Sequence, residues 1–151
     1  MWRALTVNIA ETAQAHEDVR LRGRTYAIPF EDVWNAAHTV ATVALHGWRI
    51  VSSDDQAGVI KAEATTRFGR KIDDVWIRIS LDENAQTRVD ARSAARQGRG
   101  DWGRNARRLN RFFRALDHAV VEARRQRLGA RQAGQAATVS AATGAAEVRR
   151  G

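Results

Sequence analysis

RSAARQGRGDWGRNARRLNRFFRAL, residues 92–116, is the stretch in which a strand-like pattern changes into a helical one. It places arginines, glycines, one aspartate, one asparagine and one tryptophan at the junction. Such a junction could bind a small anion, contact nucleic acid, or fasten the last helix to the sheet. The choice depends on which side of each element carries the polar residues.

The last helix is predicted from about Gly103 to Arg127, because apolar residues recur on one face at 100° per residue. That face contains Leu109, Phe112, Phe113, Leu116, Val120 and Ala123. Almost opposite it lie Arg104, Arg107, Arg111 and Arg114. We expect these four arginines to face solvent, where they could bind an anion or follow a phosphate backbone.

Two other polar residues of the junction are expected to face the sheet. Asp101 precedes the helix and is its expected N-cap, because its carboxylate can accept hydrogen bonds from the first amides. Asn105 falls on the apolar face, where an unpaired amide would cost roughly 1–3 kcal/mol. Its expected partners are the backbone of the glycine-rich loop, Arg92 or Arg96, or the pair Asp73 and Asp74.

The glycine-rich turn also allows a ligand-binding interpretation. A turn that enters a helix presents amides to an anion, and the nearby arginines add charge. The segment GRGDWG is neither a Walker loop nor a dinucleotide fingerprint, since it lacks the GKS/T ending and has different glycine spacing. Asp101 would compete with an anion for the same amides. A structural latch and an anion site therefore both remain open.

The rest of the chain predicts the fold. A strand at Arg24–Ile28 ends at Pro29, and residues 30–46 show helical spacing with Gly47 at the expected cap. Strands are expected at 48–53, 59–66, 75–81 and 88–93, with the clearest alternation in 75–81. The order β-α-β-β-β-β-α predicts an α+β fold, with two helices on one face of a mainly antiparallel sheet.

The predicted domain organisation has three parts. Residues 1–18 show no clear period and are expected to form an N-terminal arm, either loose or a short helix. Residues 19–127 form a single α+β domain. Residues 128–151 are rich in alanine and glycine without apolar periodicity, which predicts a disordered tail.

Composition indicates an ordinary soluble protein. The chain has 151 residues, of which 44% are hydrophobic and 28% charged. No apolar run approaches the roughly 20 residues of a membrane helix, and the N-terminus lacks the pattern of a signal peptide. A cytoplasmic location is therefore expected. The absence of cysteine excludes disulfides and thiol chemistry.

Positive charge is concentrated near the junction. Residues 88–131 hold thirteen arginines against four acidic residues, a net +9, so the remainder contributes −1 to the total of +8. Arginine binds carboxylate and phosphate groups bidentately. An arginine bias also follows from codon usage in a GC-rich genome.

No catalytic signature is present. The four histidines lack metal-ligand spacing, and there is no glycine-elbow nucleophile. Asp73 and Asp74 come directly before the strand expected at 75–81. Adjacent residues of a regular strand point to opposite faces, so the two side chains could not both address one substrate from such a strand. We therefore expect a non-enzymatic protein without metal or cofactor. The oligomeric state is not indicated.

Three segments resemble one protein family. GWRIVSSDDQAGVIKAEATT, DDVWIRI and RVDARSAARQGRGDWGRNARRLNRFFRAL are similar to the bacterial family catalogued as domain of unknown function 1499, over about Arg20–Leu116. The family's motif residues match Arg92, Ser93, Arg96, Gly98, Asp101, Gly103, Asn105 and Arg108, and its paired aspartates match Asp73 and Asp74. The chain departs from the motif at Ala94 and Ala95, where the family often has arginine or serine. The resemblance implies no activity.

The sequence thus predicts a small non-enzymatic binding or accessory domain with a polar centre at the last strand–helix junction. The predicted centre, either structural or ligand-binding, comprises Asp73, Asp74, Arg92, Ser93, Arg96, Asp101, Asn105 and Arg108. The first alternative is a protein that binds an anion or nucleic acid through Arg104, Arg107, Arg111 and Arg114. The second is a hydrolase that works through Asp73 or Asp74.

Overall fold

The computed structural model describes residues 9–11, 23–66, 71–96 and 102–148. In chain order its elements are β1 (Ile9–Glu11), β2 (Arg24–Tyr26), α1 (Phe30–Thr39), the π-helical turn η3 (Val40–Ala44), β3 (Trp48–Asp54), β4 (Val59–Thr65), β5 (Ile72–Leu81), β6 (Thr87–Ala95) and α2 (Trp102–Val148). An antiparallel sheet with two helices confirms the predicted α+β fold.

The sheet is built from consecutive hairpins in the order β3-β4-β5-β6. The short strands β1 and β2 both pair with the outer edge of β6, β1 beside Arg92 to Ala94 and β2 beside Thr87 to Val89. The prediction of a loose arm or short helix in the first 18 residues is therefore wrong at β1. A strand of three residues is too short to show a period of two.

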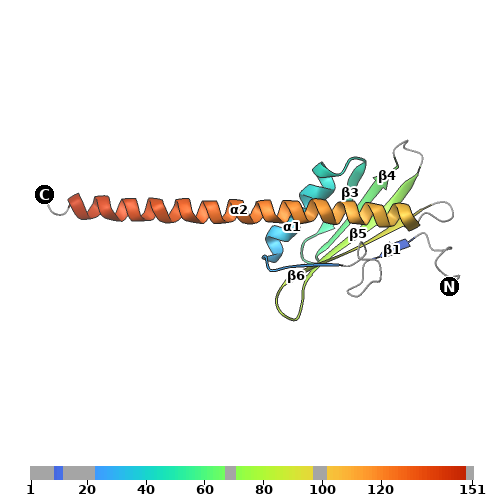
Figure 1. Ribbon diagram of the computed structural model, residues 1–151, viewed down its shortest axis with the longest axis horizontal. Coiled ribbons are helices and arrows are strands. Elements are labelled where there is room, and N and C mark those ends of the chain that lie inside the picture. The colour runs from blue at the N-terminus through green and yellow to red at the C-terminus, as the bar shows by residue number, and fades with distance from the viewer. Residues whose placement is uncertain (1–8, 12–22, 67–70, 97–101, 149–151) are drawn as a thin grey trace.

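The hydrophobic core lies between one face of the sheet and the two helices (Figure 1). The strands contribute Ile60, Ala62, Ala64, Val75, Ile77, Ile79, Val89 and Ala91. Helix α1 and the turn after it contribute Val33, Ala36, Ala37, Val40 and Leu45. Helix α2 contributes Ala106, Leu109, Phe112, Phe113, Leu116 and Val120, which confirms its predicted apolar face. Burial of each Leu or Phe side chain contributes roughly 1.5–3 kcal/mol.

The first helix changes geometry before it reaches β3. Regular α-helix ends at Thr39, and the last turn widens into η3, where the Leu45 amide donates to the Val40 carbonyl over 3.2 Å. Gly47 has φ +81, the left-handed conformation expected of a residue that ends a helix. The chain then enters β3 at Trp48, so this turn lies at the corner of the sheet.

Helix α2 crosses the sheet and then projects well beyond it (Figure 1). We predicted an end near Arg127 and a disordered tail from residue 128, but the structure is helical to Val148. Residues 128–142 are exposed, so this extension has no apolar face to reveal it in the sequence. It is rich in alanine, the residue with the highest helix propensity, and needs no periodic pattern to be helical.

The turn between β3 and β4 requires a glycine at position 58. Gly58 has φ +67, and an added Cβ would overlap the carbonyl oxygen of Ile79, which leaves no room for a side chain. We expect Gly58→Ala to lower the free energy of unfolding by about 1–3 kcal/mol in urea denaturation. Gly134→Ala is the matched control, because a Cβ there meets nothing within 4 Å. A Gly58→Ala protein as stable as the parent would contradict this view of the turn.

Candidate functional site

The two adjacent aspartates of β5 lie on opposite faces of the sheet. Asp73 is fully buried on the face covered by α2, where its partner in the pairing with β6 is Ala95. Asp74 lies on the outer face and pairs with Arg96. This is the alternation that the sequence predicted, so the two carboxylates do not meet in one site.

Asp73 is neutralised by two arginines of α2. Arg108 Nη1 lies 2.6 Å from Asp73 Oδ2, and Arg104 contacts both carboxylate oxygens at 3.2 Å. The prediction that Arg104 faces solvent is therefore wrong. Arg104 lies in the first turn of α2, from where its long side chain reaches back to the buried carboxylate. A charge in this position is costly unless it is paired.

Ser93 and Asn105 complete the buried polar cluster, which we define as Asp73, Ser93, Arg104, Asn105 and Arg108. The Ser93 hydroxyl donates to Asn105 Oδ1 over 2.7 Å, and Arg108 Nη1 donates to the same oxygen over 2.8 Å. Arg108 Nη1 also donates to Ser93 Oγ over 3.2 Å. The predicted burial of Asn105 is confirmed, but Ser93 and Arg108 were not among its expected partners.

The remaining described members of the predicted polar centre lie on the outer face. Arg96 binds Asp74 with two nitrogens and also bonds to Glu63, and its hydrogen bond, together with that of Arg49, lowers the pKa of the Glu63 carboxyl. The Arg92 guanidinium lies 5.3 Å from the ring centroid of Trp76. The predicted centre is thus divided between the two faces of the sheet. Asp101 lies outside the described residues.

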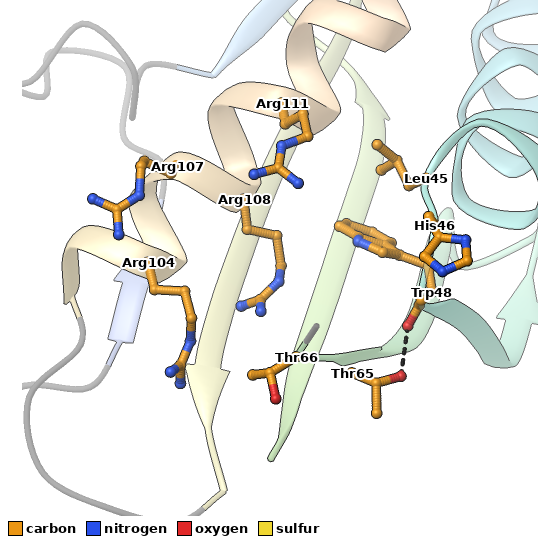
Figure 2. Close-up of a pocket in the computed structure, with 10 residues that line it drawn as sticks. Leu45, His46, Trp48, Thr65, Thr66, Arg104, Arg107, Arg108 and Arg111 are labelled. Atoms are coloured by element: carbon orange, nitrogen blue, oxygen red, sulfur yellow. Dashed lines mark hydrogen bonds between the residues drawn. The ribbon is translucent and has the colours of Figure 1, made fainter. Parts of the chain in front are cut away.

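A cavity of about 780 Å³ adjoins the buried polar cluster, between the first turns of α2 and the corner where η3 leads into β3 (Figure 2). We call it the arginine cleft. Its lining residues are Leu45, His46, Gly47, Trp48, Thr65, Thr66, Arg104, Arg107, Arg108 and Arg111. The four arginines follow one another at intervals of three, one and three residues, so all come from two turns of α2.

The cleft has one basic wall and one wall from the sheet. Figure 2 shows Arg108 and Arg111 extending from α2 on one side of the cleft and Trp48 on the other side, with Thr65 and Thr66 at the end of β4 below them. The Trp48 ring stacks on Phe112 of the core, with centroids 5.8 Å apart and 12° between planes. This contact holds the tryptophan in place at the bottom of the cleft.

Positive charge in the cleft is only partly compensated. Arg104 and Arg108 share Asp73, whereas Arg107 and Arg111 form no ion pair with any described residue. No described carboxylate therefore neutralises Arg107 or Arg111. Burial lowers the pKa of Arg108, and the positive charges of Arg104 and Arg111 lower it further, against the opposing effect of Asp73. An anion in the cleft would relieve this repulsion.

The lining of the cleft also offers hydrogen-bond donors. The Thr66 hydroxyl oxygen accepts from the Lys71 amide over 3.2 Å, so its own proton can be donated elsewhere. The Trp48 indole N–H has no acceptor among the described residues. Thr65 differs, because its hydroxyl donates to the Gly47 carbonyl over 2.9 Å (Figure 2). The chemistry of the cleft thus suits a ligand rich in acceptors.

Sequence reasoning missed one wall of the cleft. Leu45, His46, Gly47, Trp48, Thr65 and Thr66 were not predicted as site residues. The predicted pairing of 48–53 with 59–66 places the start of one strand beside the end of the other, and the observed register joins Trp48 to Ala64. No pattern, however, indicates that α2 crosses this corner.

Two further observations concern metal sites and membrane spans. Among the described residues, no group of three or more His, Asp or Glu side chains could hold a metal ion. Within the same residues, none of the helices combines the length and hydropathy required to cross a bilayer.

Comparisons with known proteins identify a family without an assigned activity. A family model described as "Protein of unknown function (DUF1499)" matches residues 5–116. A search of curated proteins gave no match. Among solved structures, the crystal structure of Ara h 8.0201 is similar, with 11% identity and a TM-score of 0.35 over 77% of this chain and 99% of that chain. A likeness of this degree carries no argument about function.

Asp73 and Asp74 form a matched pair for testing the buried polar cluster. Asp73→Asn leaves Arg108 buried beside a neutral group, so we expect the free energy of unfolding to fall by about 3–5 kcal/mol. Asp74→Asn removes only an exposed ion pair and should cost less than about 1 kcal/mol. Urea denaturation of both variants provides the measurement. An equal decrease in the free energy of unfolding in both variants would show that the buried ion pair of Asp73 contributes no more to stability than the exposed ion pair of Asp74.

Proposed function

The chain belongs to the DUF1499 family, a family of unknown function. We propose that the chain is a non-enzymatic domain that binds a small anion in the arginine cleft. In this proposal the buried polar cluster is a structural latch that holds α2 on the sheet. The latch also positions the arginines of the cleft.

The proposal rests on the position of Arg107 and Arg111 in the cleft lining and on the lack of an ion pair between either residue and any described residue. Arginines on the outer side of a helix are commonly solvated, and such residues alone indicate no ligand. These two line a cavity, have no ion pair with any described residue, and lie beside two further arginines that share one carboxylate. Guanidinium groups arranged in this way favour a carboxylate or a phosphate group as their partner.

The latch has a separate role in the proposal. Asp73, Ser93 and Asn105 are fully buried, and their hydrogen bonds involve the first turns of α2. Buried polar networks of this kind hold a unique packing arrangement when their members are satisfied. Arg104 and Arg108 belong to the latch and also line the cleft, so the cleft is prearranged before any ligand binds.

The described lining residues favour binding over catalysis as the proposed function. Among the described residues that line the cleft there is no carboxylate, no Cys and no Ser, and the one histidine is His46. A hydrolytic reaction would need a positioned base together with a nucleophile or activated water. The arginines supply charge and hydrogen bonds but are poor proton acceptors, because they remain protonated at neutral pH.

Nucleic acid is the second candidate ligand, and Arg114 is the residue that favours it. Arg107, Arg111 and Arg114 are all exposed along α2, but Arg114 lies outside the cleft. A phosphate backbone that follows the helix would use all three, and its affinity would fall steeply with added salt. A small anion in the cleft would use only the first two.

Isothermal titration calorimetry with phosphate, pyrophosphate and citrate tests the proposal at low salt. We expect Arg111→Ala to weaken binding by roughly 10- to 100-fold, because a charge-assisted hydrogen bond contributes about 1.5–3 kcal/mol. Arg107→Ala should also weaken it. Both residues are exposed, so neither change should lower the melting temperature.

Arg114→Ala is the matched control, since it removes an equally exposed arginine of α2 outside the cleft. The proposal requires that this variant bind small anions as the parent does. If all three substitutions weaken binding of a DNA or RNA duplex equally, and no small anion binds, the cleft proposal is wrong and the helix-face alternative is supported.

A further inference from the structure

We infer that the anion of the arginine cleft is an organic one, with a planar aromatic group that lies against Trp48 and a phosphate or carboxylate group that meets Arg111. This inference rests on the proposed function and adds the class of ligand to it. Three features of the cleft support it: its size, its apolar portion and the position of its donors.

The size of the cleft exceeds the needs of an inorganic ion. Its volume of about 780 Å³ lies within the range of roughly 300–1,000 Å³ that is usual for sites of organic ligands. A phosphate or sulfate ion would occupy a small fraction of this space and would reach only some of the lining residues. The remaining volume fits an organic body attached to the anionic group.

The apolar portion of the cleft is formed by Leu45 and Trp48. Leu45 belongs to the hydrophobic core, and the Trp48 ring is held by its stacking on Phe112. A tryptophan fixed in this way is a preorganised surface, because little rotamer freedom remains to be lost when a ligand packs on it. Aromatic rings favour another planar ring as a neighbour.

The polar groups lie where a ligand of this shape would need them. Arg111 and Trp48 lie on facing sides of the cleft, so an anionic group can meet the Arg111 guanidinium while the ring of the ligand contacts the indole (Figure 2). The Trp48 indole N–H and the Thr66 hydroxyl are donors without a described acceptor for their protons. They could bind acceptor atoms on the ring of the ligand.

Three probes of equal anionic chemistry test the inference on the unaltered protein: phenyl phosphate, cyclohexyl phosphate and inorganic phosphate. By calorimetry we expect phenyl phosphate to bind roughly 2- to 10-fold more tightly than cyclohexyl phosphate, the contribution of an aromatic pair beyond its buried area. Both esters should bind more tightly than inorganic phosphate. Benzoate and cyclohexanecarboxylate repeat the comparison for a carboxylate group.

Variants at two positions separate this inference from the proposed function. Trp48→Leu, with its fold checked by circular dichroism, should abolish the preference for the phenyl ester, so that the phenyl and cyclohexyl esters bind with equal affinity. Trp48→Phe should retain most of the preference and also serves if Trp48→Leu does not fold. Equal affinity of the parent protein for the two esters would overturn the aromatic ligand while retaining an anion site, provided Arg111→Ala still weakens both. If neither ester depends on Arg111, the proposed function itself fails.

Discussion

The arrangement of this domain depends on one buried carboxylate, Asp73. A charge that is removed from water must be paired, and the two cations that pair with it come from the first turns of α2. This requirement determines where α2 crosses the sheet. Once Arg104 and Arg108 reach Asp73, Asn105 lies over Ser93, and the apolar face of the next turns packs on the core. The polar and apolar contacts of α2 therefore specify the same orientation.

The same pairing explains why a basic cavity lies at the start of α2. Arg104, Arg107, Arg108 and Arg111 occupy neighbouring positions on two helical turns, so a helix that directs two of them to the sheet holds the other two nearby. Asp73 compensates only part of their charge. The corner formed by η3, Gly47 and β3, together with the end of β4, provides the second wall, which contributes mainly an aromatic ring and hydroxyl groups. In the proposed function, attachment of α2 and ligand binding are linked because they share Arg104 and Arg108.

Local patterns in the sequence were sufficient for most of the fold. The alternation in β5 and β6 predicted the buried and exposed sides of both strands, and it correctly separated Asp73 from Asp74. The spacing in α2 predicted its core face and the burial of Asn105.

The failures arose where a pattern is short or has no apolar component, as in β1 and in the extension of α2 to Val148. The prediction for Arg104 was wrong because the helical angle gives only the direction of the Cα–Cβ bond. The long side chain of an arginine can turn back and bring its guanidinium to a buried charge. The cleft could not be derived, since its two walls are far apart in the sequence and meet only through tertiary packing.

We propose that Asp73 engages Arg104 and Arg108 and that Arg107 and Arg111 are thereby available to a ligand. The most direct measurement is NMR of the arginine side-chain Nε–Hε groups during titration with phenyl phosphate. We expect saturable chemical-shift changes at Arg107 and Arg111 and no chemical-shift change at Arg114. Before any ligand is added, the Nε–Hε protons of Arg104 and Arg108 should exchange slowly with solvent. Rapid exchange at Arg104 and Arg108, or shifts that occur uniformly along α2, would contradict it.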